Sequence, residues 1–123
     1  MYVRNAWYVA AWADEVTNMA PLGRTYLGED VVLFRREDGT AVALEDRCCH
    51  RSLPLSLGKV VGDHLQCGYH GLLYDGNGRC IRVPGQQQVP PGGQLRAYPL
   101  IERWQALWVW MGDPSFADHS LIP

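Results

Sequence analysis

Two cysteines and two histidines in the middle of the chain form two matched pairs. Cys48-x-His50 is followed, after sixteen residues, by Cys67-x-x-His70. Each pair offers one thiolate and one imidazole, and both are good ligands for transition metals. Two thiolates on one iron and two imidazoles on the other would suit a two-iron cluster. The predicted cofactor and metal ligands are Cys48, His50, Cys67 and His70.

The mixed ligand set also predicts the redox chemistry of such a centre. Replacing two thiolates by neutral imidazoles removes two negative charges from the cluster, which raises its reduction potential. The second ring nitrogen of each imidazole can carry a proton or a hydrogen bond. Electron transfer can therefore be coupled to protonation or to contact with a partner group.

Two other uses of these residues compete with an iron cluster. A structural zinc ion accepts the same four side chains, although zinc sites more often use C-x₂₋₄-C and H-x₃₋₅-H spacings. Four cysteines could also form two disulfides. However, a chain of 123 residues can bury a core without them, and two of the cysteines sit beside histidines. An iron centre is the favoured interpretation, and zinc is the alternative.

The other cysteines and histidines receive no ligand role. Cys49 lies between two predicted ligands and is interpreted as a small packed residue, and Cys80 as a strand residue. His64 falls in a predicted strand with Leu65 on the opposite face, so an exposed surface histidine is expected. His119 lies in an irregular stretch and is assigned no role.

Short strands separated by glycine turns must position the ligand pairs. Three β-hairpins are predicted, formed by residues 30–37 with 40–45, 59–61 with 64–67, and 72–75 with 79–84. The second hairpin returns the chain on itself, so the two loop tips, each with one cysteine and one histidine, are expected to meet.

The remaining segments complete an all-β pattern. A Pro/Gly/Gln-rich loop covers residues 84–93, as a surface connection or a lid on the cluster, and residues 95–103 and 106–113 are strand-like. One helical turn is predicted near Ala13 to Val16. Many short strands with regular turns predict an antiparallel β-sandwich or a small barrel.

Composition limits the partners and the location. The chain is long enough for one domain. Eleven Lys and Arg against thirteen Asp and Glu give a net charge of −2, so no nucleic-acid or anionic-membrane partner is expected. No segment approaches the ~18–20 apolar residues of a membrane-spanning helix. The first residues lack the apolar run of a signal peptide, so a cytoplasmic location is expected.

The ligand pairs and their flanks resemble a known family. The segment CGYHG resembles the Rieske iron–sulfur motif. The segments VRNAWYVAAW, PLGRTYLGEDVVLFR, ALEDRCCHRSLPLSLG, VPPGG and VWMGDP resemble the N-terminal domain of Rieske non-haem iron oxygenases, most closely the vanillate and dicamba O-demethylase oxygenase components. The resemblance implies a Rieske-type antiparallel β-sandwich and a [2Fe–2S] cluster. It also implies a small cluster-binding subdomain of two hairpin loops, at about residues 46–83.

The resemblance further implies one-electron transfer as part of an oxidoreductase. The domain would be the electron relay of an aromatic-ring or O-demethylating monooxygenase. A reductase carrying flavin and an iron–sulfur cluster would donate electrons, and a mononuclear-iron catalytic domain of a neighbouring subunit would accept them through His70. That iron is held by two histidines and a carboxylate. No such set follows His70 here, so residues 1–123 are expected to be a single Rieske domain without the catalytic domain. The alternative is a free-standing Rieske-type ferredoxin.

Four further positions acquire a meaning from the resemblance. Leu53 and Tyr69 stand where respiratory Rieske proteins have bridging cysteines, so that disulfide is not expected. Leu72 replaces a serine that hydrogen-bonds a cluster sulfide there, which implies a potential near the lower end of the Rieske range. Tyr74 matches a tyrosine that donates a hydrogen bond to a ligand-cysteine sulfur in some Rieske proteins.

Overall fold

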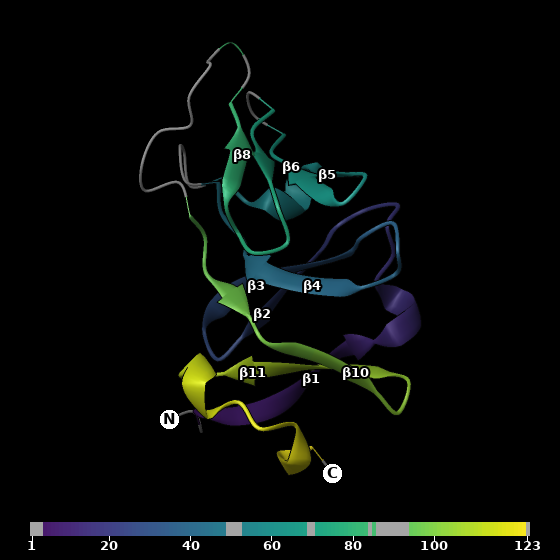
Figure 1. The fold of residues 1–123 in the computed structure, drawn as a ribbon, viewed down its shortest axis with the longest axis vertical. Coiled ribbons are helices and arrows are strands. Elements are labelled where there is room, and N and C mark those ends of the chain that lie inside the picture. Colours follow the sequence, from purple (N-terminus) through teal and green to yellow (C-terminus); the bar gives the residue numbers. More distant parts are fainter. Residues whose placement is uncertain (1–3, 49–52, 69–70, 84, 86–93, 123) are drawn as a thin grey trace.

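Three antiparallel sheets are stacked as layers in the computed structural model of the protein (Figure 1). In the part of the chain that the structure describes, every helix is a one-turn 3₁₀ helix. The all-β class and the antiparallel arrangement predicted from the sequence are therefore confirmed. The described residues are 4–48, 53–68, 71–83, 85 and 94–122.

The lower sheet in Figure 1 brings together segments from near the two ends of the chain. It consists of β1 (Ala6–Trp12), β11 (Ala106–Met111) and β10 (Leu100–Arg103), in that order. The register of β1 with β11 shifts between Val9 and Ala11, which leaves Ala10 as an extra residue. Both Ala10 and Ala11 are buried. This bulge interrupts the alternation of inward and outward side chains, and β1 was not predicted.

The middle sheet contains the first predicted hairpin. It consists of β2 (Leu22–Tyr26), β3 (Glu29–Arg35), β4 (Ala41–Glu45) and β9 (Ala97–Tyr98), in that order. β3 and β4 form the hairpin predicted around Asp38 and Gly39, and Gly39 adopts a φ of 89° that suits glycine. β2 was not predicted.

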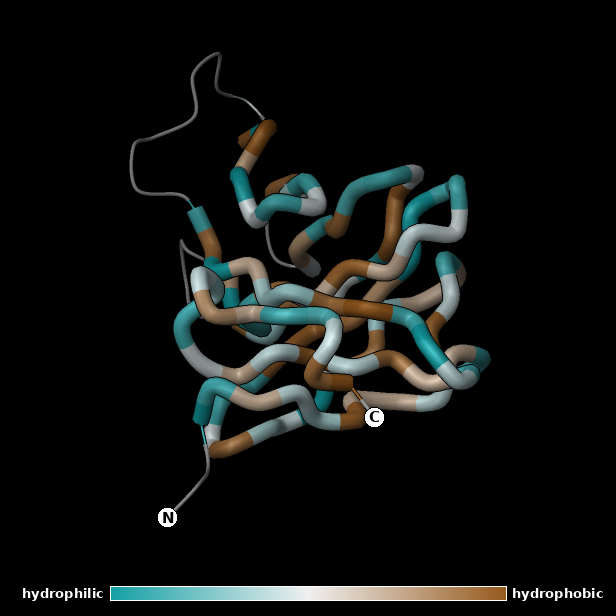
Figure 2. The backbone as a smooth tube through the Cα atoms, turned by 60° about the horizontal axis from the view of Figure 1, so that its bottom comes forward, coloured by the Kyte–Doolittle hydropathy of each residue, from teal (hydrophilic) through white to brown (hydrophobic). Residues whose placement is uncertain are grey.

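β3 is buried on both of its faces. Val31 and Leu33 belong to a hydrophobic cluster shared with the lower sheet, whereas Val32 and Phe34 belong to a second cluster shared with the upper sheet. All four side chains are fully buried. This explains why residues 31–34 are all apolar, whereas a strand with one exposed face would alternate apolar and polar residues. Figure 2 shows apolar segments running through the interior and polar ones gathered at the turns.

The upper sheet follows the predicted second and third hairpins. It consists of β5 (Lys59–Val61), β6 (His64–Gln66), β7 (Leu73–Tyr74) and β8 (Cys80–Arg82), in that order. The turn between β7 and β8 is the predicted one. Its Asp75 carboxylate accepts hydrogen bonds from the backbone N–H groups of Asn77 and Arg79 at 2.9 and 3.0 Å. A short 3₁₀ helix, η2 (Leu55–Leu57), precedes β5.

Pro99 divides the predicted strand at residues 95–103 between two layers. Ala97 and Tyr98 pair with β4 in the middle sheet, and β10 begins at Leu100 in the lower sheet. Proline has no N–H to give to a ladder, but its carbonyl still accepts from the N–H of Trp110 at 3.0 Å. The chain therefore changes sheets at this residue.

Three more one-turn 3₁₀ helices lie near the ends of the chain: η1 (Ala13–Glu15), η3 (Pro114–Phe116) and η4 (His119–Leu121). η1 is the predicted helical turn, whereas η3 and η4 were not predicted. The Trp7 indole N–H donates to the carbonyl of Asp118 at 2.8 Å, which fastens the C-terminal stretch to β1. Within the described ranges, no helix has the length and apolar character needed to cross a membrane.

Candidate metal centre

Cys48 and Cys67 each begin a loop that is closed in the same way. The N–H of Cys48 donates to the carbonyl of Leu53 at 2.6 Å, and the N–H of Cys67 donates to the carbonyl of Leu72 at 2.8 Å. In both cases the acceptor lies five residues after the cysteine. The backbone thus repeats the symmetry of the two Cys/His pairs.

The two cysteines are buried in one apolar environment. Cys48 is 1% and Cys67 is 2% exposed, and both belong to the hydrophobic cluster that also contains Leu55 and Leu65. His50 and His70, the other two predicted ligands, lie outside the described residues, as do Cys49, Tyr69 and nearly all of the loop at residues 84–93. The structure therefore describes the sulfur half of the predicted ligand set.

Tyr74 contacts one of these sulfurs directly. Its hydroxyl lies 3.4 Å from the Sγ of Cys48, and its side chain is fully buried in β7. A cysteine that binds a metal does so as a thiolate, which has no proton to donate. The Tyr74 hydroxyl is then the donor, in agreement with the role that the family resemblance gave it.

The strand that leads into Cys48 ends in a paired carboxylate. Glu45 accepts from the N–H of Arg96 at 3.0 Å and from the Arg47 guanidinium at 2.5 Å. Burial raises the pKa of Glu45, but the hydrogen bonds and charges of Arg96 and Arg47 outweigh it, so its pKa is lowered. This carboxylate is therefore ionised near neutral pH, and the positive charges of Arg47 and Arg96 balance its negative charge.

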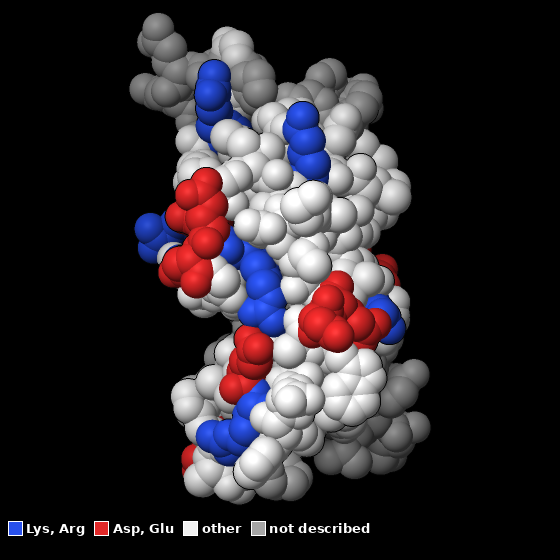
Figure 3. Space-filling view, turned by 90° about the vertical axis from the view of Figure 1, so that its right-hand side faces the viewer, with Lys and Arg blue, Asp and Glu red and all other residues white. Residues whose placement is uncertain are grey.

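Acidic and basic side chains lie next to each other on the face of the molecule drawn in Figure 3. The structure contains ion pairs between such side chains, among them Arg24 with Glu15 at 2.8 Å and Arg35 with Glu102 at 2.9 Å. The mixture agrees with the small net charge of −2.

The structure also places the residues that received no ligand role. Cys80 is a buried residue of β8, as predicted, and its thiol donates to the carbonyl of Arg82 at 3.7 Å. His64 begins β6, where it pairs with Val61, and it is half-buried, so the expectation of an exposed histidine was wrong. His119 packs edge-on against Trp7, with 6.0 Å between ring centroids, which no sequence pattern had indicated.

The two leucines that distinguish the chain from respiratory Rieske proteins differ in burial. Leu53 is 36% exposed, whereas Leu72 is 4% exposed and packs in the same cluster as the cysteines. A buried leucine at position 72 has no hydroxyl to offer to a sulfur. Of the side-chain hydrogen bonds to the cluster or its ligands that the resemblance raises, the described residues therefore supply one, from Tyr74 to the Cys48 sulfur.

A family model described as the Rieske [2Fe–2S] domain matches residues 6–99, which include all four predicted ligands. The chain belongs to the Rieske family. Rieske domains carry a [2Fe–2S] cluster with two cysteines on one iron and two histidines on the other. The cofactor of this domain is accordingly a Rieske-type [2Fe–2S] cluster.

Known Rieske proteins match along nearly the whole chain. The chain is 54% identical, over 99% of its length, to a putative toluene-4-sulfonate monooxygenase system iron–sulfur subunit of Comamonas testosteroni. Over the same share of its length, it is 48% identical to the oxygenase component of dicamba O-demethylase of Stenotrophomonas maltophilia. The crystal structure of apo dicamba monooxygenase superposes with a TM-score of 0.94 at 47% identity, covering 99% of this chain and 38% of that one. The chain spans 35% and 36% of the two relatives' lengths.

The described residues fit such a cluster. Two buried cysteines at the starts of equivalent loops suit an iron held by two thiolates, and an apolar surrounding lowers the local dielectric and limits access of water. The contact of Tyr74 with Cys48 supplies a hydrogen-bond donor for a ligand sulfur. The chemistry of the donors and their burial agree with the family.

Proposed function

We propose that this Rieske domain relays single electrons within a non-haem iron oxygenase of the aromatic-ring or O-demethylating type. The proposal rests on the equivalent closure of the loops that begin at Cys48 and Cys67, two cysteines that are buried in one apolar cluster, as thiolates that share an iron would have to be. Further support comes from relatives whose names describe oxygenase components, including those of dicamba and vanillate O-demethylases.

We assign the cluster to Cys48 and Cys67 on one iron and to His50 and His70 on the other. When bound, the cluster accepts and gives up one electron at a time. The protein residues hold it in place, exclude water and tune its charge. Tyr74 donates to the Cys48 sulfur, which favours the more electron-rich state. A cluster-binding subdomain at residues 46–83 would contain all of these groups.

The partners follow from the same proposal. A reductase with flavin and an iron–sulfur cluster would supply the electrons, and a mononuclear iron in the catalytic domain of a neighbouring subunit would receive them. His70 is proposed as the exit ligand, because the free nitrogen of an imidazole ligand can hydrogen-bond a group of the acceptor. The cysteines are proposed to bind iron together with histidines, which requires reduced thiols. A reducing compartment keeps thiols reduced, so the cytoplasm is the proposed location.

A free-standing Rieske-type ferredoxin is the second candidate. It would use the same cluster and the same ligands but would deliver electrons to a separate protein. The coding sequence beyond Pro123 tests the choice between the two. An open frame that encodes two spaced histidines and a carboxylate supports the oxygenase. A stop codon directly after Pro123 in the native gene contradicts it and supports the ferredoxin.

A further inference from the structure

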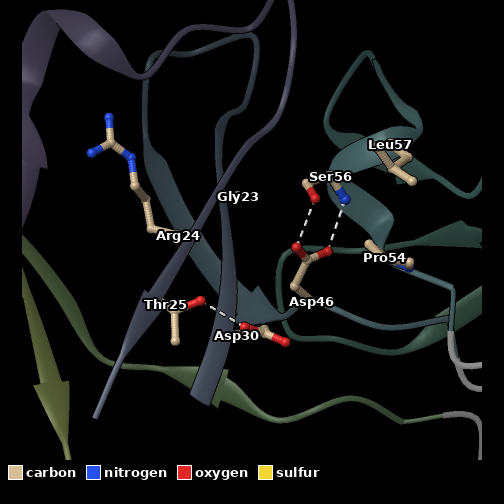
Figure 4. Close-up of a pocket in the computed structure, with 8 residues that line it drawn as sticks. All are labelled: Gly23, Arg24, Thr25, Asp30, Asp46, Pro54, Ser56 and Leu57. Atoms are coloured by element: carbon tan, nitrogen blue, oxygen red, sulfur yellow. Dashed lines mark hydrogen bonds between the residues drawn. The ribbon is translucent and has the colours of Figure 1, made fainter. Parts of the chain in front are cut away.

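Asp46 and Ser56 form a clasp across the base of the first cysteine loop. Asp46 precedes Cys48 by two residues, and Ser56 follows Leu53, where the loop closes. The N–H of Ser56 donates to Asp46 Oδ1 at 2.8 Å, and its hydroxyl donates to Asp46 Oδ2 at 2.7 Å. Both carboxylate oxygens are thereby engaged by one residue (Figure 4).

The clasp rests on a glycine of the middle sheet. A Cβ atom added at Gly23 in β2 would lie 2.6 Å from the Oγ and 2.8 Å from the Cβ of Ser56, closer than a Cβ atom approaches other heavy atoms, and 3.0 Å from Asp46 Oδ2. Only glycine leaves room for the clasp at this point of the strand. The same three residues line a cleft of about 320 Å³ together with Asp30, Pro54 and others. The clasp is therefore packed against the backbone of β2.

The segment that begins at the clasp ends against the second cysteine loop. Ser56 lies in η2, and the next residue after that helix is Gly58. A Cβ atom at Gly58 would lie 1.9 Å from the carbonyl oxygen of Gln66 and 3.1 Å from the backbone nitrogen of Gly68. Gln66 and Gly68 flank Cys67 on either side. The backbone after η2 thus touches the backbone around the second cysteine.

The geometry points to Asp46 as a positioning residue that sets the second cysteine loop relative to the first. The clasp fixes η2 to the strand end before Cys48, and Gly58 fixes the other end of η2 against the backbone at Cys67. Residues 55–58 act as a spacer between the two loops. This inference rests on the proposed function, since it matters for the cofactor only if both loops hold one cluster. Asp46 itself contacts Ser56 and is not a ligand.

Four variants of the purified, cluster-loaded protein test this inference. Asp46→Ala removes the clasp, Ser56→Ala removes one of its two hydrogen bonds, and Asp46→Asn keeps its shape without the charge. Gly23→Ala disturbs the clasp without changing either member. Asp113→Ala is the matched control, because Asp113 accepts from the N–H and hydroxyl of Ser115 at 3.0 and 2.8 Å in the distant C-terminal turn.

Two quantities are measured: the rate at which an iron chelator bleaches the visible absorbance, and the width of the electron paramagnetic resonance lines of the reduced protein. We expect Asp46→Ala to bleach about tenfold faster or more, which corresponds to about 1.4 kcal/mol. Ser56→Ala and Gly23→Ala should bleach roughly threefold faster or more, and all three should broaden the lines. Asp46→Asn should stay within about threefold of the unmodified rate. Asp113→Ala should lower the melting temperature without changing either readout.

The outcomes separate this inference from the proposed function. If the unmodified protein loads no iron–sulfur cluster, the proposed function fails and the inference falls with it. If the unmodified protein loads the cluster but Ser56→Ala and Gly23→Ala bleach at its rate with unchanged lines, the clasp has no positioning role. An Asp46→Asn variant that behaves like Asp46→Ala would overturn the inference in favour of a charge effect. Should Asp46→Ala fail to fold, the milder Ser56→Ala and Asp46→Asn decide.

Discussion

The hydroxyl of Tyr74 lies 3.4 Å from the Sγ of Cys48, and both side chains are buried, at 0% and 1% exposure. Water does not compete for this contact, so the hydroxyl interacts with the sulfur in a low-dielectric surrounding. A donor to a ligand sulfur stabilises the reduced, more negative state of the cluster. The contact therefore links one phenol of the core to the reduction potential of the proposed centre.

Tyr74→Phe should lower the reduction potential while the cluster stays bound. A lost hydrogen bond worth about 1 kcal/mol in the reduced state corresponds to roughly 40 mV for a one-electron couple. A spectroelectrochemical titration measures the shift. Tyr26→Phe is the control, because the Tyr26 hydroxyl donates to the carbonyl of Ala10 in the other hydrophobic cluster. Equal potentials for Tyr74→Phe and the unmodified protein would contradict the role given to Tyr74.

His70 should respond to substitution as a ligand does. His70→Cys is expected to retain iron better than His70→Ala, because a thiolate can still bind the metal. It should also lower the potential, because it adds a negative charge to the cluster. Iron and acid-labile sulfide analysis with a redox titration measures both effects, and His64→Ala in β6 serves as the control. Identical iron content in His70→Cys and His70→Ala would mean that His70 is not a ligand.

Glu29 should make the fold sensitive to acid. Burial raises the pKa of Glu29, but hydrogen bonds from Arg4 and Tyr98 outweigh it, and its pKa is lowered from 4.5. Since the folded-state pKa lies below the unfolded one, the stabilisation is complete above about pH 5 and is lost as the pH falls through the folded-state pKa. Glu29→Gln should therefore lower the free energy of unfolding at pH 7 and flatten its decline below pH 4.5.

Urea unfolding between pH 3 and pH 7 measures the effect of Glu29→Gln. Glu37→Gln, at an exposed position in the turn after β3, is the matched control and should leave the curve nearly unchanged. An acid limb of the same steepness in Glu29→Gln and in the unmodified protein would refute the assignment to Glu29.

Gln105→Gly should stabilise the protein. Trp104 and Gln105 connect β10 and β11 with φ angles of 58° and 61°, a left-handed conformation that costs ordinary residues about 1–2 kcal/mol each. Glycine adopts it freely but loses more conformational entropy on folding, so the expected net gain is about 0.5–1 kcal/mol. Thermal unfolding measures it. Gln66→Gly, at the end of β6, should instead destabilise the fold. A lower melting temperature for Gln105→Gly would contradict the strain.

The hairpins that could be predicted from the sequence are those with Asp and Gly residues typical of turns. Asp38 with Gly39, and the stretch from Asp75 to Gly78, are turn sequences with glycine at a positive φ, and both hairpins are present. The β10–β11 turn gave no such signal, because Trp104 and Gln105 replace the usual glycine and asparagine. β1 was hidden by its bulge, and β2 by Gly23, its second residue, which the clasp requires.

The candidate site was predictable where the chemistry lies in residue type and spacing. The Cys/His pairs and Tyr74 could be proposed from the motif and the family resemblance, and the structure places Cys48, Cys67 and Tyr74 together in one core. The clasp could not be foreseen. Asp46 and Ser56 are ten residues apart on opposite sides of a loop, and no local period or motif pairs them. Their relationship arises from tertiary packing against Gly23.

Electron paramagnetic resonance of the dithionite-reduced protein tests the central claim most directly. If two thiolates bind one iron and two imidazoles the other, the anaerobically prepared protein will contain two iron and two sulfide per chain. It will then give a Rieske-type signal with nitrogen coupling from two histidine ligands. A colourless protein with one zinc per chain and no such signal, or a cluster signal without nitrogen coupling, would contradict it.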